Sequence, residues 1–230
     1  MVIMKEELLA GWGRTSPSTS TVASLLPGDS AAAVLTAAGP RGALARGLGR
    51  AYGDAAQNGG GLVIRPAGGT IVLDAAAGTL TADAGTSLDE ILRRVVPHGW
   101  FVPVTPGTRY VTVGGAIAAD IHGKNHHRVG TFGAHVTSMD VLLASGQLRT
   151  VTPTAADPAD RELFAATVGG MGLTGIILTA TIAMLPIETS LISVDTQRCT
   201  DLDDLMAQMV RADEEYTYSV AWIDSVAKGA

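Results

Sequence analysis

The hydrophobic and polar positions of this chain repeat with the two periods that distinguish helices from strands. A helix is predicted to open at Ser87, because Ser87 and Glu90 have the spacing of a capping box and the apolar residues that follow share one helical face. Those residues are Leu88, Ile91, Leu92 and Val95. A shorter alanine-rich helix is predicted after Asp29 or Ser30, and another over residues 159–168, stopped by Gly169-Gly170.

Apolar runs bounded by turn residues predict the strands. After a polar amino-terminal stretch they cover residues 43–46, 62–66, 71–83 with a turn at Ala77-Gly78, 136–153 with a turn at Ser145-Gly146, and 173–185. Past Pro186 we expect another strand, an amphipathic helix at 201–210 and a strand at 216–224. That helix would direct Leu202, Leu205, Met206 and Met209 inward. Helices among strands and hairpins indicate an α+β or mixed α/β fold.

Composition narrows the class of protein. Hydrophobic residues make up 47% of the 230 residues and charged residues 17%, which is too apolar for a disordered chain. A net charge of -6 with no basic run argues against nucleic acid as a partner. The single cysteine, Cys199, excludes an internal disulfide. We find no signal peptide, and the longest apolar run, 176–185, is too short to span a bilayer, so we expect a soluble or membrane-peripheral protein.

The candidate chemistry is concentrated in TVGGAIAADIHGKNHH, residues 112–127. Gly114 and Gly115 carry no side chain, so we expect main-chain N–H groups there to approach a bound anion. The other end of the segment places titratable donors on one short loop; these are His122, Lys124, His126 and His127. A phosphate-bearing cofactor at one end and polar chemistry at the other is the natural interpretation.

Five segments together resemble one flavoprotein family. GLGRAYGD, NGGGLVI, VTPGTRYVTVGGAIAADIHGKNHH, VTSMDVLLASG and ATVGGMGLTGIIL occur in the order found in vanillyl-alcohol-oxidase-type FAD enzymes. The chain resembles the amino-terminal half of such an enzyme. The resemblance implies an α+β fold in which a two-subdomain FAD-binding domain of the PCMH type covers residues 1–186. Residues 187–230 would then be the incomplete beginning of an α+β cap domain that carries much of the substrate site.

The resemblance also implies which residues contact FAD. The glycine loop that contains GLGRAYGD would hold the diphosphate. The second glycine segment, which contains Gly114 and Gly115, would continue the contact, and Ile177 would hold a ring edge. The implied cofactor residues are Ala45, Arg46, Gly47, Leu48, Gly49, Arg50, Ala51, Tyr52, Gly53, Asp54, Ala55, Gly107, Thr112, Val113, Gly114, Gly115, Ala119, Asp120, Ile121, His122 and Ile177. Arg50 stands where some members carry a histidine bonded to FAD, so the cofactor is expected to be non-covalent.

DIHGKNHH is most similar to the branch of the family that works on a lipid-linked phosphosugar. The implied reaction oxidises the 2′-hydroxyl of decaprenylphosphoryl-β-D-ribose to the 2′-keto sugar, the first half of an epimerisation that supplies arabinose for cell-wall arabinan. Tyr52, His122 and Lys124 would be the catalytic residues that face the substrate. The implied partner is an NAD(P)H-dependent keto-reductase, and the implied location is peripheral to a membrane, on its cytoplasmic or periplasmic face.

Other interpretations remain open from the residues alone. The same fold suits an aldonolactone or alditol oxidase, and the chain itself also suits a flavin-binding fragment without activity of its own. A more distant alternative is a metal-dependent hydrolase that uses His122, His126 and His127, although no carboxylate or cysteine joins them at ligand spacing, so no metal is expected. His126 and His127 are also suited to hydrogen-bonding the backbone, and Tyr52 to packing on its loop.

Overall fold

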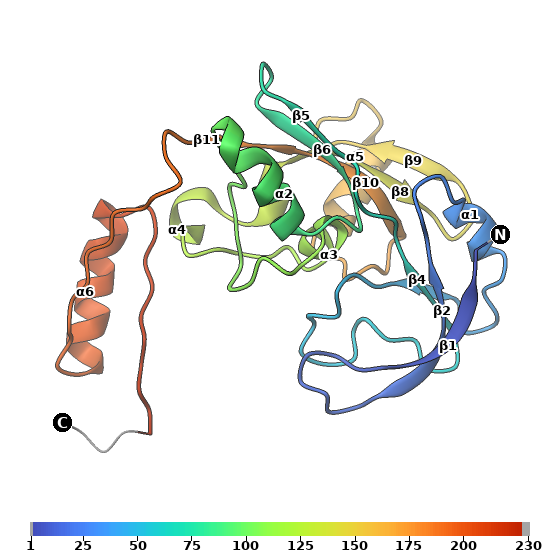
Figure 1. Ribbon diagram of the computed structural model, residues 1–230, viewed down its shortest axis with the longest axis horizontal. Coiled ribbons are helices and arrows are strands. Elements are labelled where there is room, and N and C mark those ends of the chain that lie inside the picture. Colours follow the sequence, from blue (N-terminus) through green and yellow to red (C-terminus); the bar gives the residue numbers. More distant parts are fainter. Residues whose placement is uncertain (1, 227–230) are drawn as a thin grey trace.

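A computed structural model describes residues 2–226 and contains two main sheets (Figure 1). The smaller sheet has the order β1-β2-β4-β3. Its strands are β1 (Met4–Leu9), β2 (Ser18–Ser24), β4 (Leu62–Arg65) and β3 (Ala43–Ala45). β1 and β2 form an antiparallel hairpin, whereas β2 and β3 both run parallel to β4. The polar amino-terminal stretch therefore contains two strands that the sequence pattern did not predict.

The larger sheet is antiparallel throughout and has the order β5-β6-β10-β8-β9. Its strands are β5 (Ile71–Asp74), β6 (Thr79–Asp83), β10 (Ile176–Ala183), β8 (Val136–Leu142) and β9 (Leu148–Val151). β10 occupies the centre, so both of its edges pair with a neighbouring strand. Both predicted hairpins are present, and Gly146 at one turn has a φ of +83°, a conformation that glycine adopts without strain.

Short helices cover the larger sheet and complete its core. They are α2 (Leu88–Val95), η1 (Val96–His98), α3 (Val113–Ala118), α4 (His126–Val129), η2 (Phe132–His135) and α5 (Pro158–Thr167). The predicted capping box of α2 is confirmed, and its face carries Leu88, Ile91 and Val95 into the core, each fully buried. A two-stranded ladder joins β7 (Trp100–Phe101) to β11 (Leu185–Pro186).

The two sheets share apolar contacts. α1 (Ala31–Leu35), capped by Ser30 as predicted, packs in a cluster with Ile64 of β4. Leu142 of β8 and Ile176 of β10 belong to that same cluster, so the core of the smaller sheet continues into the larger one. Segregated helices, one mixed sheet and one antiparallel sheet confirm the α+β fold.

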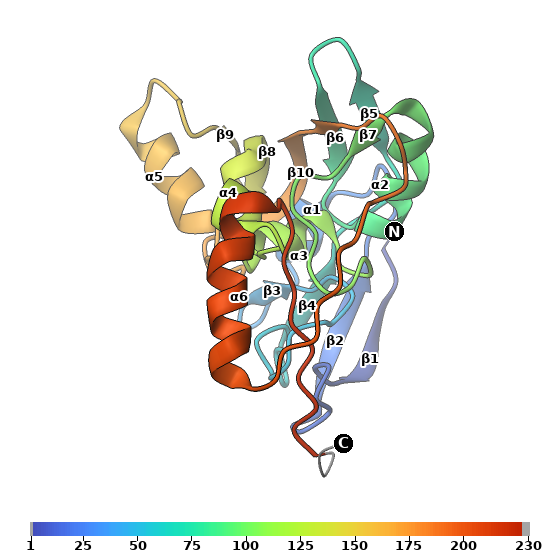
Figure 2. The ribbon, with the colours of Figure 1, turned by 90° about the vertical axis from the view of Figure 1, so that its left-hand side faces the viewer.

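Residues 187–226 form an arm that lies beside this body (Figures 1 and 2). The predicted helix is present as α6 (Leu202–Glu215), opened by Asp201, but none of its residues is buried. Leu202 and Met206 are 60% and 59% exposed, so their predicted inward placement is wrong, whereas Leu205 and Met209 are half-buried. The strands predicted after Pro186 and at 216–224 are also wrong, because neither segment forms the continuous ladder of backbone hydrogen bonds that a strand of a sheet requires.

Candidate functional site

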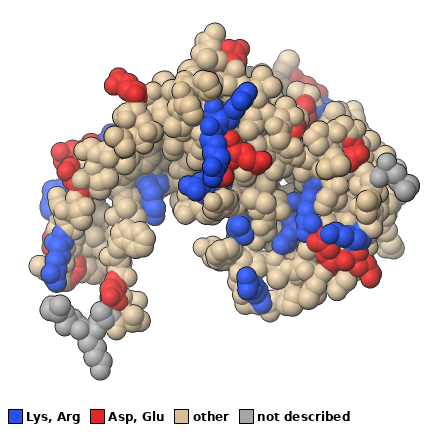
Figure 3. Space-filling model, viewed as in Figure 1, with Lys and Arg blue, Asp and Glu red and all other residues tan. Residues whose placement is uncertain are grey.

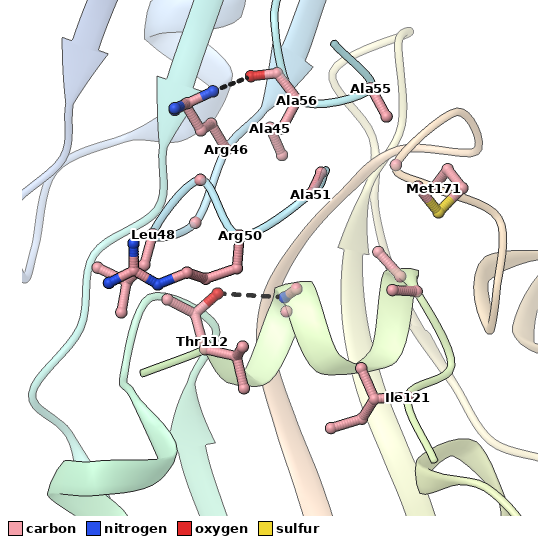
Figure 4. Close-up of a pocket in the computed structure, with 18 of the residues that line it drawn as sticks. Ala45, Arg46, Leu48, Arg50, Ala51, Ala55, Ala56, Thr112, Ile121 and Met171 are labelled. Atoms are coloured by element: carbon pink, nitrogen blue, oxygen red, sulfur yellow. Dashed lines mark hydrogen bonds between the residues drawn. The ribbon is translucent and has the colours of Figure 1, made fainter. Parts of the chain in front are cut away.

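A cavity of about 790 Å³ lies where the two sheets and α3 meet (Figure 4). Most of its lining comes from three segments: residues 45–56 after β3, residues 106–121 around α3, and residues 171–177 leading into β10. The first segment follows a strand of the smaller sheet, the second contains α3, and the third leads into the central strand of the larger sheet, so both sheets and α3 fix the walls. Trp12, Pro66 and Ala84 complete the lining.

The glycine loop, residues 46–56, presents free backbone donors to this cavity. None of the N–H groups from Gly47 to Ala56 donates a hydrogen bond to any residue that the structure describes. Gly49 adopts a φ of +68°, which permits the sharp turn in the middle of the loop. Successive unpaired N–H groups in such a turn form a concavity suited to an anion.

Arg46 fixes the shape of the glycine loop from inside. Its guanidinium donates to the carbonyl oxygen of Ala56 at 2.7 Å (Figure 4) and to that of Ala10 at 2.6 Å. Burial, followed by the nearby charge of Arg65, lowers the pKa of Arg46. The side chain is therefore largely committed to holding the protein's own backbone.

The second glycine segment does not offer free donors, contrary to expectation. The N–H of Gly114 donates to the Ala84 carbonyl at 2.9 Å, and the N–H of Gly115 donates to the Thr112 hydroxyl at 3.2 Å (Figure 4). These glycines instead permit close packing, because a Cβ on Gly114 would lie 3.0 Å from the Ala84 Cβ. Of the two glycine segments, the first is therefore the one that offers free donors for the anion contact predicted from the sequence.

Four of the implied cofactor residues lie outside the cavity lining. Val113 is fully buried in the core, and Asp54 and His122 do not reach the cavity. Asp120 turns away with a φ of +40°, and its carboxylate accepts a hydrogen bond from the Gly133 N–H at 2.8 Å. The remaining implied residues line the cavity. They are Ala45, Arg46, Gly47, Leu48, Gly49, Arg50, Ala51, Tyr52, Gly53, Ala55, Gly107, Thr112, Gly114, Gly115, Ala119, Ile121 and Ile177.

The three implied catalytic residues are not brought together around the cavity. Tyr52 lines it and is 80% exposed, whereas His122 and Lys124 do not line it. Ile121 and His122 are consecutive residues in an extended segment that pairs with Thr131. Because successive side chains of extended backbone point to opposite sides, Ile121 faces the cavity and His122 faces away.

One ring nitrogen of His126 and one of His127 lie close to backbone carbonyl oxygens. His126 Nδ1 lies 3.3 Å from the Gly123 carbonyl oxygen, and His127 Nε2 lies 3.3 Å from that of Tyr216. The His122 and His126 ring centroids are 5.8 Å apart. Among residues 2–226, no cluster of three or more His, Cys, Asp or Glu side chains has a geometry that could hold a metal ion.

Several residues that line the cavity were not predicted from the sequence. The most informative are Trp12, Tyr110 and Met171, which come from three separate loops. Trp12 lies between two glycines in GWG, which was the one local signal of a close backbone approach. Met171 has a φ of +54°, a strained conformation that no sequence pattern marks.

The charge of the cavity is positive although the chain is acidic overall. Arg46 and Arg50 line it, and no Asp or Glu of the described residues does. Arg50 lies beside Leu48 and Thr112 at one end of the cavity (Figure 4). The cavity therefore suits an anionic ligand. Across residues 2–226, no helix combines the length and apolar character needed to cross a bilayer.

Comparisons with known proteins agree with this geometry. Residues 29–152 match the family described as FAD binding domain. The decaprenylphosphoryl-beta-D-ribose oxidase of Mycolicibacterium smegmatis is 51% identical over 226 residues, which cover 96% of this chain and 48% of that protein. An uncharacterized protein of Streptomyces coelicolor is 48% identical over 63% of this chain and 38% of its own length.

The D-lactate dehydrogenase of Archaeoglobus fulgidus is a more distant relative, 32% identical over 45% of this chain and 24% of its own length. The chain spans about half the length of the first of these relatives, or less of the others. The matched family segment covers more than half of the chain and includes both glycine segments. The chain belongs to the FAD binding domain family, and its cofactor is FAD.

Proposed function

We propose that this chain is the FAD-binding part of an oxidase that acts on the 2′-hydroxyl of decaprenylphosphoryl-β-D-ribose. In this proposal FAD occupies the cavity of about 790 Å³, a volume within the range of roughly 300–1,000 Å³ usual for ligand sites. The observation that carries the proposal is the run of unpaired N–H groups from Gly47 to Ala56 along that cavity. A diphosphate supplies the acceptors that these donors lack.

The chain's residues divide the work of binding. Arg46 and Thr112 shape the loop and the start of α3, while apolar residues such as Ile121 and Ile177 offer surfaces for the rings. FAD, once bound, supplies the capacity to accept a hydride from an alcohol carbon. Because arginine at position 50 cannot form the bond that a histidine forms, we propose that FAD is held without a covalent link.

Tyr52 is the residue best placed to meet a substrate, since it lines the cavity and is open to solvent. His122 and Lys124 remain proposed substrate-side residues, because their loop is exposed and lies next to the arm. The Lys124 carbonyl accepts the Ser219 N–H at 3.0 Å, which fixes that loop against residues after α6. We further propose that residues 187–230 begin a substrate domain, and that the keto product passes to an NAD(P)H-dependent reductase at a membrane surface.

The first test is cofactor binding. The purified 230-residue chain, incubated with FAD and freed of excess, should be yellow and retain the flavin absorption band. After acid precipitation the flavin should remain in the supernatant, because no covalent bond holds it. A colourless protein, or flavin that precipitates with the chain, would contradict this part of the proposal.

The second test addresses the substrate. Under anaerobic conditions the FAD-loaded protein should lose its flavin absorption when mixed with a short-chain polyprenylphosphoryl-β-D-ribose. The matched control is the 2′-deoxy sugar, which offers no hydroxyl to oxidise and should leave the absorption unchanged. Bleaching by D-lactate or an aldonolactone, with none by the phosphoribose, would assign the site to another substrate class.

A further inference from the structure

The turn between β1 and β2, residues 10–14, lies directly against the glycine loop. The Trp12 N–H donates to the Ala51 carbonyl at 2.8 Å, and the Gly13 N–H donates to the Tyr52 carbonyl at 3.2 Å. The approach is close enough that a Cβ on Gly11 would lie 2.0 Å from the Gly53 carbonyl oxygen. The turn precedes residue 29, where the family match begins, yet it is a wall of the cavity.

This turn brings an indole ring to Arg50. The guanidinium carbon of Arg50 lies over the Trp12 ring, 5.0 Å from its centroid. On another side, Arg50 Nε donates to the Tyr110 carbonyl oxygen at 3.1 Å. The indole face and the Tyr110 carbonyl oxygen thus fix the plane of the guanidinium, although Trp12 and Arg50 are both exposed to solvent.

Arg50 has N–H donors without a described partner, and it belongs to the glycine loop, whose backbone N–H groups are also unpaired. An arginine carries five N–H donors, and only the Nε–H of Arg50 has a partner among the described residues. The other lining cation, Arg46, is committed to carbonyl oxygens. Arg50 is therefore the lining cation able to meet an anion with its terminal N–H groups.

We propose that Trp12 is a positioning residue of the cofactor site, which holds the Arg50 guanidinium so that its terminal N–H groups bind the diphosphate of FAD. This inference rests on the proposed function, because it requires FAD in the cavity. Trp12 acts through Arg50. Removing the indole is expected to cost affinity only while Arg50 is present.

A double-mutant cycle on the 230-residue chain tests this coupling, with the dissociation constant of FAD read from flavin fluorescence. Arg50→Met should weaken binding about tenfold through loss of a charge-assisted contact. Trp12→Ala should weaken it about threefold, as expected for an exposed cation–π pair. The double variant should bind no more weakly than Arg50→Met alone, and Trp12→Phe should bind like the unmodified chain.

A second readout is the salt dependence of FAD binding. Screening weakens a contact between charges, so both Arg50→Met and Trp12→Ala should make the dissociation constant less sensitive to salt. The matched controls are Arg94→Met and Trp222→Ala, which remove an exposed arginine and an exposed tryptophan away from the cavity. Neither control should change the affinity or the salt dependence.

The outcomes separate the inference from the function on which it rests. If the unmodified chain binds no FAD, the proposed function fails. If it binds FAD but Trp12→Ala has no effect, or its loss adds fully to that of Arg50→Met, the positioning role is overturned. Should Trp12→Ala not fold, as judged by circular dichroism, the same cycle with Trp12→Leu gives the decision.

Discussion

Thr112 stands at the point where the two glycine segments meet. Its hydroxyl accepts the N–H of Gly115 and so caps α3. Gly47, at the start of the other segment, packs on the same side chain, and a Cβ there would lie 2.3 Å from the Thr112 hydroxyl oxygen. Two segments 65 positions apart in the chain are thus fitted together through one threonine.

This contact predicts a large effect of one methyl group. Gly47→Ala should lower the free energy of unfolding of the FAD-free chain by about 2 kcal/mol, since the methyl overlaps Thr112 and the backbone must shift. Gly53→Ala, in the same loop, is the control, because its Cβ would meet nothing within 4 Å. Urea unfolding measures both. Equal stabilities of the two variants would show that Thr112 yields freely.

A second prediction concerns Glu7 in β1. Hydrogen bonds from Arg65 and then from Lys5 lower the pKa of Glu7 from 4.5 to about 2. The ion pair therefore stabilises the fold above about pH 4.5, and this stabilisation is lost as the pH falls towards 2. Because the Glu7 side chain is 20% exposed, we expect a contribution of about 1 kcal/mol.

Thermal unfolding of Glu7→Gln across that pH range checks the prediction. The variant should be less stable than the unmodified chain at neutral pH, and the difference should vanish by about pH 2. Glu6→Gln, an exposed neighbour on the other face of β1, is the control and should track the unmodified chain. A difference that persists unchanged in acid would argue against the ion pair.

At the residue scale the sequence could predict where glycines matter but not why. Gly47 and Gly114 look alike in the sequence, yet the N–H of Gly47 is unpaired while that of Gly114 is bonded to Ala84. The direction of an N–H group depends on tertiary packing, which local residue types do not encode. For the same reason Ile121, rather than His122, lines the cavity.

At the scale of elements, α2 is the most locally determined part of the chain. The Ser87 hydroxyl accepts the N–H of Glu90 at 3.2 Å, and the Glu90 carboxylate accepts the N–H of Ser87 at 2.8 Å. Ser87→Ala should lower the free energy of unfolding by about 1 kcal/mol, while the exposed Ser190→Ala should leave it unchanged. Chemical denaturation measures both, and no loss in Ser87→Ala would mean that tertiary contacts alone hold the helix start.

Elements with a local signal were predictable, and elements that depend on a partner were not. The hairpins at Gly78 and Gly146 were predictable because glycine marks each turn. β1 reads MKEELL, and its charged residues conceal a strand that exists because β2 pairs with it. Residues 216–224 show the opposite case, because they alternate between apolar and polar positions and yet form no strand.

At the scale of the whole molecule, a hollow separates much of the arm from the body on the face that Figure 3 shows. Near α4 the arm is attached mainly by polar contacts: Arg128 donates to the Glu214 carbonyl, and His127 lies 3.7 Å from the Asp213 carboxylate. α6 buries none of its residues, whereas Ile182 of β10 is fully buried. The arm should therefore open with a smaller free energy than the body.

Hydrogen exchange followed by mass spectrometry tests this difference. Amides of α6 should exchange at least about tenfold faster than those of β10, because α6 has no fully covered residue and its local opening exposes little apolar surface. α2, whose apolar face is buried, serves as the internal control for a helix and should resemble β10. Equal protection of α6 and β10 would mean that the arm and the body unfold as one unit.

The α+β fold and the presence of a flavin site were predictable, whereas the convergence of remote loops was not. Trp12, Arg50 and Tyr110 meet only because the β1–β2 hairpin lies against the loop after β3. No periodicity links positions so far apart. The sequence therefore predicted the cofactor but not the cavity wall that Trp12 contributes.

The central place of β10 also governs when the larger sheet can form. Its neighbours β6 and β8 are synthesised first, and the edge of β6 that does not pair with β5 has no partner until β10 is made, roughly a hundred residues later. Until β10 has been made, one edge of β6 and one edge of β8 lack the partner strand that each has in the folded sheet. We therefore expect slower translation or added chaperones to raise the yield of folded chain, because pairing of strands across so long a loop is slow.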